Sequence, residues 1–186
     1  MTPCPQCQQL VTPGASDCAA CGYSFGAAPE ENTGPKGIGG WLLLPLLGLI
    51  ISPIRIIHQI ATELVPVLRS DVWSALTHPA SANYHPLWAP AIIFEMAGNA
   101  VIVLFGFWVL ASFLTKSSMT PRLLIIWVAS FVAIQAIDIL LMSQIPMAAS
   151  QLGAGDFREL ARAVISAAIW IPYFLKSKRV ANTFVH

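Results

Sequence analysis

Residues 87–114 read LWAPAIIFEMAGNAVIVLFGFWVLASFL, and Glu95 is the one charged residue in this stretch. A helix needs about 20 mainly apolar residues to cross the ~30 Å hydrocarbon core of a bilayer, so this stretch is long enough to span a membrane. A surface helix of a soluble bundle would carry a charged face, which this stretch lacks. The sequence therefore predicts a membrane-spanning helix here.

Three further apolar stretches meet the same length requirement, at residues 38–62, 122–145 and 157–175. The composition agrees, because 56% of the 186 residues are hydrophobic and 10% are charged. We expect an all-α integral membrane protein with a four-helix transmembrane bundle over residues 38–186. Pro45 and Pro53 should kink the first span or break it into short pieces. Asp156 with Glu159 resembles a capping box that opens the last span.

Two C-x-x-C pairs lie at the start of the chain, Cys4 with Cys7 and Cys18 with Cys21. Four thiolates at this spacing are typical of a tetrahedral zinc site, with rubredoxin-like iron or a redox dithiol as alternatives. Residues 1–25 are therefore predicted to form a zinc ribbon around one structural ion, followed by a flexible linker over 26–37. A closed shell of four thiolates leaves no position for a reacting water, so we expect no catalysis at this metal.

Lysine and arginine residues predict the orientation of the chain. Those expected on one side of the membrane are Lys36, Lys116, Arg122, Lys176, Lys178 and Arg179. The positive-inside rule then places both termini in the cytoplasm of a bacterial inner membrane, and the polar start of the chain predicts no secretory signal peptide. A cytoplasmic segment stays reduced, which favours metal binding over disulfides at the cysteines.

The predicted ribbon is acidic. Residues 1–35 contain Asp17, Glu30 and Glu31 but no lysine or arginine. Such a segment repels phosphate, so we expect contact with a protein partner and not with nucleic acid.

Polar residues recur inside the predicted spans. They are Arg55, His58, Glu95, Asn99, Gln135, Asp138 and Arg162. In each of the first three spans the two polar residues are three or four apart, so they share a helical face. At a rise of about 1.5 Å per residue, the four charged members fall at one level in the outer half of the membrane. We expect them to form a polar network that faces the bundle interior.

This network has more than one interpretation. It could only join the helices and fix their register, or it could line a cavity that opens to the outer side and binds an ion, a lipid headgroup or a small polar molecule. Enzymatic chemistry is disfavoured, because the sequence has no H-E-x-x-H, Walker or G-x-S-x-G motif.

Two motifs at the ends of the hydrophobic region resemble a known family. Residues 37–42 read GIGGWL and residues 173–180 read YFLKSKRV. With these motifs the chain resembles, over about 37–184, the bacterial family catalogued as domain of unknown function 2569. The resemblance implies a small four-span inner-membrane protein, with an added amino-terminal ribbon in some members, and no established activity.

We therefore expect a non-enzymatic membrane module that acts in regulation, assembly or scaffolding, with the ribbon contacting a protein partner. The alternative is a small transporter or a ligand or lipid sensor that uses the polar network. Four spans are few to enclose a path across the bilayer, so this alternative implies a homo-oligomer.

Overall fold

The computed structural model describes residues 1–25, 34–69 and 71–185, and the chain divides into two units, Met1–Pro35 and Lys36–His186. Most of the predicted linker, residues 26–33, lies outside the described residues, so the linker stays a prediction. The first unit contains the four cysteines and the second contains all the long helices.

The first unit has little regular structure. Strands β1 (Thr2–Pro3) and β2 (Leu10–Val11) pair antiparallel, and a single bridge joins Asp17 to Ser24. So few backbone pairs and so short a chain bury little apolar surface, which means that another interaction must hold this unit together.

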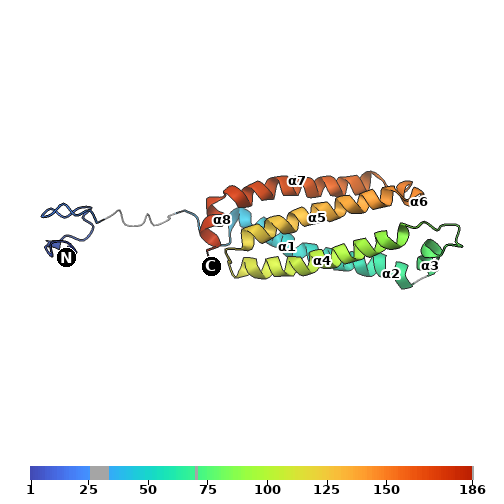
Figure 1. Cartoon of the computed structure of the whole chain (residues 1–186), viewed down its shortest axis with the longest axis horizontal. Coiled ribbons are helices and arrows are strands. Elements are labelled where there is room, and N and C mark those ends of the chain that lie inside the picture. Colours follow the sequence, from blue (N-terminus) through green and yellow to red (C-terminus); the bar gives the residue numbers. More distant parts are fainter. Residues whose placement is uncertain (26–33, 70, 186) are drawn as a thin grey trace. The chain divides into compact units, whose positions relative to one another are not determined.

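Helices make up the second unit, with turns and short loops between them (Figure 1). In chain order they are η1 (Gly40–Leu42), α1 (Leu43–Gln59), η2 (Ile60–Leu64), α2 (Val65–Arg69), α3 (Asp71–Thr77), α4 (Trp88–Leu114), α5 (Thr120–Ser143), α6 (Pro146–Ala149), α7 (Ala154–Lys176) and α8 (Lys178–Thr183).

The first hydrophobic stretch forms one continuous helical segment, Gly40–Arg69, which changes from 3-10 through α to π and back to α. The prolines do not break it into short pieces, because Pro53 lies inside α1, and the kink that the sequence also allowed stays a prediction. A proline removes one main-chain hydrogen bond, and the neighbouring bonds continue the helix across it. The segment also extends beyond the predicted end at residue 62.

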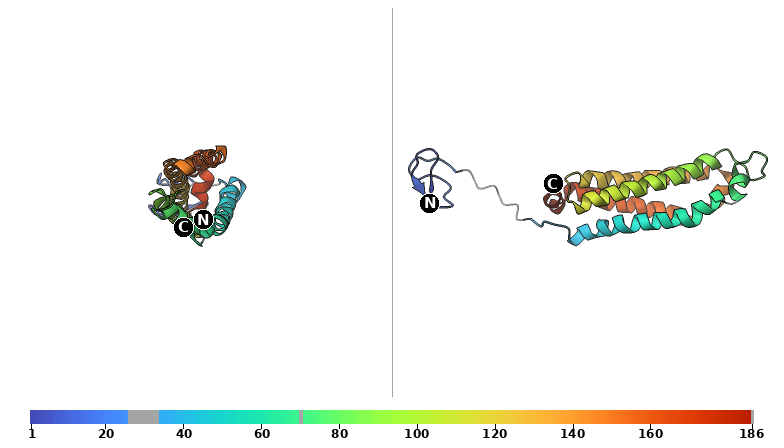
Figure 2. Two further views of the ribbon diagram at one scale, coloured as in Figure 1. Left: turned by 90° about the vertical axis from the view of Figure 1, so that its right-hand side faces the viewer. Right: turned by 90° about the horizontal axis from the view of Figure 1, so that it is seen from below.

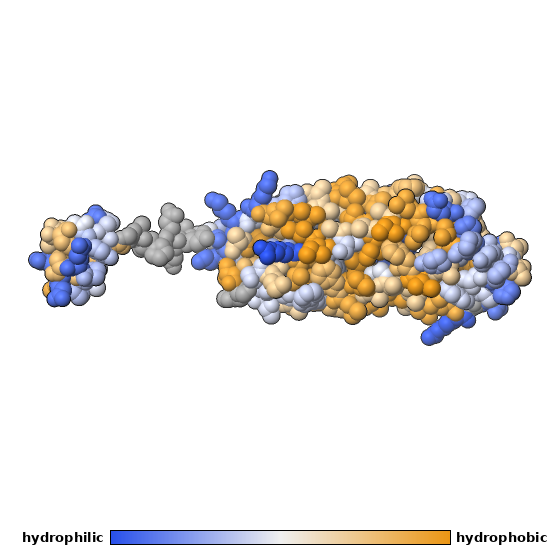
Figure 3. All heavy atoms as spheres, viewed as in Figure 1, coloured by the Kyte–Doolittle hydropathy of each residue, from blue (hydrophilic) through white to orange (hydrophobic). Residues whose placement is uncertain are grey.

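Three helical segments are long and apolar enough to cross a membrane: Gly40–Arg69, Trp88–Leu114 and Thr120–Ser143. Their most apolar windows have mean hydropathies of 2.0, 2.0 and 2.3. Figure 3 shows one face of this unit, on which hydrophobic residues cover the middle and hydrophilic residues gather toward both ends. The fourth predicted span corresponds to α7, whose charged residues keep it outside this set, so a fourth span is not shown.

The four long helices run side by side in an order that matches the chain (Figures 1 and 2). Helix α1 packs on α4, α4 packs on α5, and α5 packs on α7. Close approach of α4 and α5 depends on glycine: a Cβ atom at Gly98 would lie 2.9 Å from Cγ2 of Ile134, and one at Gly106 would lie 3.2 Å from Nε1 of Trp127. The same indole donates a buried hydrogen bond of 2.9 Å to the carbonyl of Ile102. Small residues at helix contacts are usual in membrane bundles.

The carboxyl-terminal helix α8 closes one end of the bundle. Phe184 packs on Phe113 with ring centroids 5.1 Å apart, and both side chains are buried. The hydroxyl of Thr183 accepts a hydrogen bond of 3.0 Å from the amide of Gly37. The start and the end of this unit therefore meet at the α8 end of the bundle.

Candidate functional site

The four cysteines of the first unit come together at one point. Their sulfur atoms all lie within 4.8 Å of one another, with 3.7 Å between Cys4 and Cys21 and 3.6 Å between Cys7 and Cys18. A disulfide would require about 2.05 Å, whereas tetrahedral zinc with bonds of about 2.3 Å places its sulfur ligands about 3.8 Å apart. The spacing therefore fits a four-thiolate site that could bind a metal ion.

The backbone forms the same turn around each cysteine pair. The amide of Gln8 donates to the carbonyl of Cys4, and the amide of Gly22 donates to the carbonyl of Cys18, both at 2.8 Å. Gln8 and Gly22 each have a positive φ, of 61° and 69°. A left-handed residue directly after each pair turns the chain away so that both thiols face inward, and glycine adopts this conformation without strain.

Backbone amides also favour the thiolate form at one ligand. The main-chain N–H groups of Ala20 and then Cys21 point at the Cys18 sulfur and lower its pKa from 9.0 to about 7. Since the thiolate is the metal-binding form, this environment prepares Cys18 to act as a ligand.

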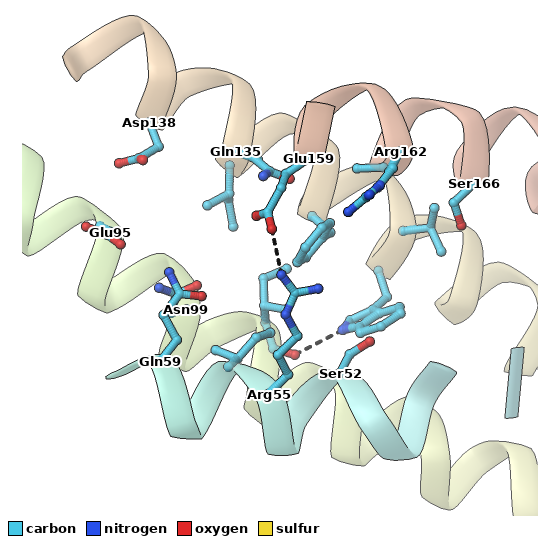
Figure 4. A pocket seen from close by; sticks show the side chains of 17 residues that line it. Ser52, Arg55, Gln59, Glu95, Asn99, Gln135, Asp138, Glu159, Arg162 and Ser166 are labelled. Carbon is cyan, nitrogen blue, oxygen red and sulfur yellow. Dashed lines mark hydrogen bonds and ion pairs between the residues drawn. The ribbon is translucent and has the colours of Figure 1, made fainter. Parts of the chain in front are cut away.

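A polar cavity of about 350 Å³ lies within the helical unit, among α1, α4, α5 and α7 (Figure 4). Its polar lining residues are Ser52, Arg55, Gln59, Glu95, Asn99, Gln135, Asp138, Glu159, Arg162 and Ser166. Apolar side chains, among them Ile102, Phe131 and Ile134, complete the walls. Six of the seven polar residues predicted from the sequence therefore surround one space. The exception is His58, which is exposed and does not line the cavity.

One ion pair crosses the cavity. Nη2 of Arg55 on α1 lies 2.6 Å from Oε1 of Glu159 on α7. Within the parts of the chain that the structure describes, no ion pair joins Arg55, Glu95, Asp138 and Arg162 directly to one another. A four-member network of these charges thus stays a prediction, and Arg55 has a different partner.

Glu159 was missed as a site residue because the sequence pattern assigned it to a helix cap. In the structure the cap uses Gly153, whose amide donates to Oδ2 of Asp156 at 2.9 Å. This leaves Glu159 free to reach Arg55. The spacing of Glu159 and Arg162, three residues apart on one helical face, is the signal that could have identified it.

The α5 wall carries two acceptors that lack donors. Oδ1 of Asp138 and Oε1 of Gln135 are buried and have no hydrogen-bond partner. Glu95 lines the same part of the cavity, half-buried on α4 (Figure 4). Buried acceptors without donors are costly, so these groups are suited to a bound ligand or ordered water.

Comparisons with known proteins concern mainly the helical unit. The chain is 26% identical over 157 residues to the "Inner membrane protein YdgK" of Escherichia coli (strain K12), covering 83% of this chain and 97% of that protein. No solved structure matches the chain. A family model described as "Protein of unknown function (DUF2569)" matches residues 35–185, a region that holds the helices and excludes the four cysteines. The chain is therefore a membrane protein that belongs to the DUF2569 family.

Proposed function

We propose that this protein is a non-enzymatic inner-membrane protein that binds a small polar ligand in the cavity among α1, α4, α5 and α7. The observation that carries the proposal is the pair of buried acceptors without donors, on Gln135 and Asp138. Residues that only joined the helices would be expected to satisfy one another. The geometry thus favours ligand sensing or transport over a purely structural network.

Binding is a better proposal than turnover because the cavity lacks the residues that nucleophilic chemistry requires. No histidine, cysteine or lysine is among its lining residues within the described chain. Its two serines, Ser52 and Ser166, therefore have no histidine or lysine base beside them. Arg55 also engages the carboxylate of Glu159 in an ion pair, so this side chain is already committed to a charged partner.

We further propose that α7 is a fourth span. Its charged residues Glu159 and Arg162 line the cavity, so these two charges need not face lipid, and its other charged residues, Asp156, Arg158 and Lys176, lie near the helix ends. Apolar side chains are exposed elsewhere on α7, including Val164, Ile165 and Ile169. With four spans, the basic residues cited above place both termini in the cytoplasm.

The proposed role of the first unit is a zinc-held module for protein contact. The sulfur spacing fits zinc, and metal binding would supply the folding energy that two short strands cannot. Leu10 and Tyr23 remain exposed as apolar contact surface. Because residues 1–35 have no basic side chain, a protein and not a nucleic acid is the expected partner.

Thermal stability of the purified protein tests the ligand-binding proposal. A panel of small anions, cations, zwitterions and uncharged polar compounds should contain at least one that raises the melting temperature, because a ligand that binds only the folded state stabilises it. Asp138→Asn should weaken that shift, and Asp71→Asn, on the exposed helix α3, is the matched control. If no compound or lipid binds, the cavity is structural and the proposal fails.

The module proposal is tested separately. Replacing Cys4 and Cys7 with serine should remove zinc and the protein partner while the helical unit still inserts in the membrane. If a protein that lacks the first unit retains full function in cells, the first unit does not bind the partner.

A further inference from the structure

The two ends of the cavity differ in chemistry. Leu114, Thr120 and Lys176 are the ends of α4, α5 and α7 that lie at the α8 end of the bundle. At about 1.5 Å per residue, Glu95 and Asp138 lie about 28 and 27 Å from this end, whereas Ser166 lies about 15 Å from it. Figure 4 shows the same separation, with Glu95 and Asp138 at one end, Ser166 toward the other, and Arg55 between. One end of the cavity is therefore rich in acceptors.

This acceptor end lacks a cation. Arg55 is committed to Glu159 at 2.6 Å. Among the described residues, neither Glu95 nor Asp138 has an ion-pair partner, and Oδ1 of Asp138 and Oε1 of Gln135 are buried without donors. Two carboxyl groups in a site of low dielectric need a counter-charge or protons, and the amide oxygen of Gln135 needs a hydrogen-bond donor as well.

A primary ammonium group has the complementary chemistry. It carries one positive charge and three N–H donors, which matches the acceptors on Glu95, Asp138 and Gln135. The cavity, at about 350 Å³, is at the lower end of the range for small organic ligands and larger than a bare ion needs. Arg162 lines the same cavity and offers a positive charge for an anionic group on the same ligand.

We propose that the cavity binds a zwitterion that joins a primary ammonium to an anionic group such as a phosphate, with its ammonium on Glu95, Asp138 and Gln135 and its anionic group toward Arg162. This inference rests on the proposed function and names the ligand class for the same cavity. Two sources carry this chemistry, an aminophospholipid headgroup and a free phosphorylated amine.

The helix arrangement offers a route for a headgroup. Helix α1 packs on α4 and α7 packs on α5, but α1 and α7 share no extended packing contact within the described chain. The side chains that link them, Arg55 and Glu159, are 69% and 48% exposed. With α7 in the membrane, the space between α1 and α7 faces lipid, and a headgroup can reach the cavity beside this pair.

The test uses the full-length protein with two probes. Native mass spectrometry from mild detergent compares retention of phosphatidylethanolamine with that of phosphatidylglycerol, and calorimetry measures binding of phosphorylethanolamine with phosphorylcholine as the analogue that lacks N–H donors. We expect the member that bears a primary ammonium to bind about tenfold more tightly in at least one pair, because hydrogen bonds between charged groups are stronger than those between neutral groups.

Glu95→Gln and Asp138→Asn should each reduce the affinity for the primary ammonium compound by about tenfold or more, because each removes one charged acceptor. Asp71→Asn, outside the cavity on α3, should leave it unchanged. Both cavity variants remove a charge from a buried site without changing its shape, and size-exclusion chromatography checks that they fold. Selective binding of the lipid alone identifies the headgroup as the source, and binding of phosphorylethanolamine identifies the free amine.

Three results would overturn the inference. Equal binding of ethanolamine and choline forms would exclude recognition through N–H donors. Stabilisation by sodium or calcium but not by any amine would make the acceptor end a metal site. If an anion or uncharged compound binds in the earlier panel and no ammonium compound does, the ligand class is wrong while the proposed ligand-binding function stands.

Discussion

The contribution of the ion pair between Arg55 and Glu159 to stability depends on whether α7 lies in the membrane. Exposed pairs in water contribute about 0.2–1 kcal/mol, and these two side chains are 69% and 48% exposed outside any membrane. If lipid surrounds them, the effective dielectric constant falls. Two unit charges about 4 Å apart attract with about 1 kcal/mol in water and about 4 kcal/mol at an effective dielectric constant of 20.

Desolvation offsets part of that attraction, so we expect a coupling energy of about 2 kcal/mol in the membrane. Arg55→Gln and Glu159→Gln each leave one unpaired charge, and each should lower the free energy of unfolding by about 2–3 kcal/mol. The double variant removes both charges and should lose no more than either single variant.

A double-mutant cycle measured by unfolding in lipid bicelles provides the assay. Arg158→Gln is the matched control, because Arg158 is exposed on the same helix and does not line the cavity. A coupling energy below about 0.5 kcal/mol would be typical of a pair in water. That result would refute the placement of α7 as a fourth span and, with it, the lateral route to the cavity.

Three further predictions concern the metal and the contact between α4 and α5. Purified protein should contain one equivalent of zinc by elemental analysis, and Cys7→Ser should lower it; an iron content, or no metal, would contradict the zinc assignment. Gly98→Ala should lower the unfolding free energy by about 1–3 kcal/mol because the added Cβ meets Ile134, and Ile134→Leu should partly restore it; no rescue would mean that another contact is disturbed. Trp127→Phe should cost about 1 kcal/mol in the same unfolding assay by removing its hydrogen bond to α4, and an unchanged stability would show that the bond contributes nothing net.

The sequence predicted the long apolar helices well because length and hydropathy alone set the requirement for crossing a bilayer. The predicted stretches 87–114 and 122–145 differ from α4 and α5 by at most two residues at each end. The first stretch was predicted to end at residue 62, yet the helix continues to Arg69. Thr62 and Glu63 lower the local hydropathy there, although neither residue prevents a helix.

The cavity was predictable in part. Residues four apart, such as Glu95 with Asn99, share a helical face within about 40°, and both line the cavity. His58 follows Arg55 by three residues and turns about 60° to the other side, where it is exposed, whereas Gln59 lines the cavity. Helical spacing selects a face, but only the positions of the neighbouring helices decide which edge of that face borders the cavity.

The two motifs that carried the family resemblance also meet in space. The ion pair between Arg55 and Glu159 is therefore not the only contact that holds the first helical segment near α7. A Cβ atom at Gly39 would lie 3.3 Å from Nη1 of Arg179, and Gly40 adopts a φ of 56° beside the same guanidinium. Together with the bond from Gly37 to Thr183, these contacts fasten the start of the first helical segment to α8, directly after α7. Because this end of the bundle is held independently, breaking the ion pair midway along the first helical segment should loosen the contact between α1 and α7 at the cavity without separating the helices where α8 joins them.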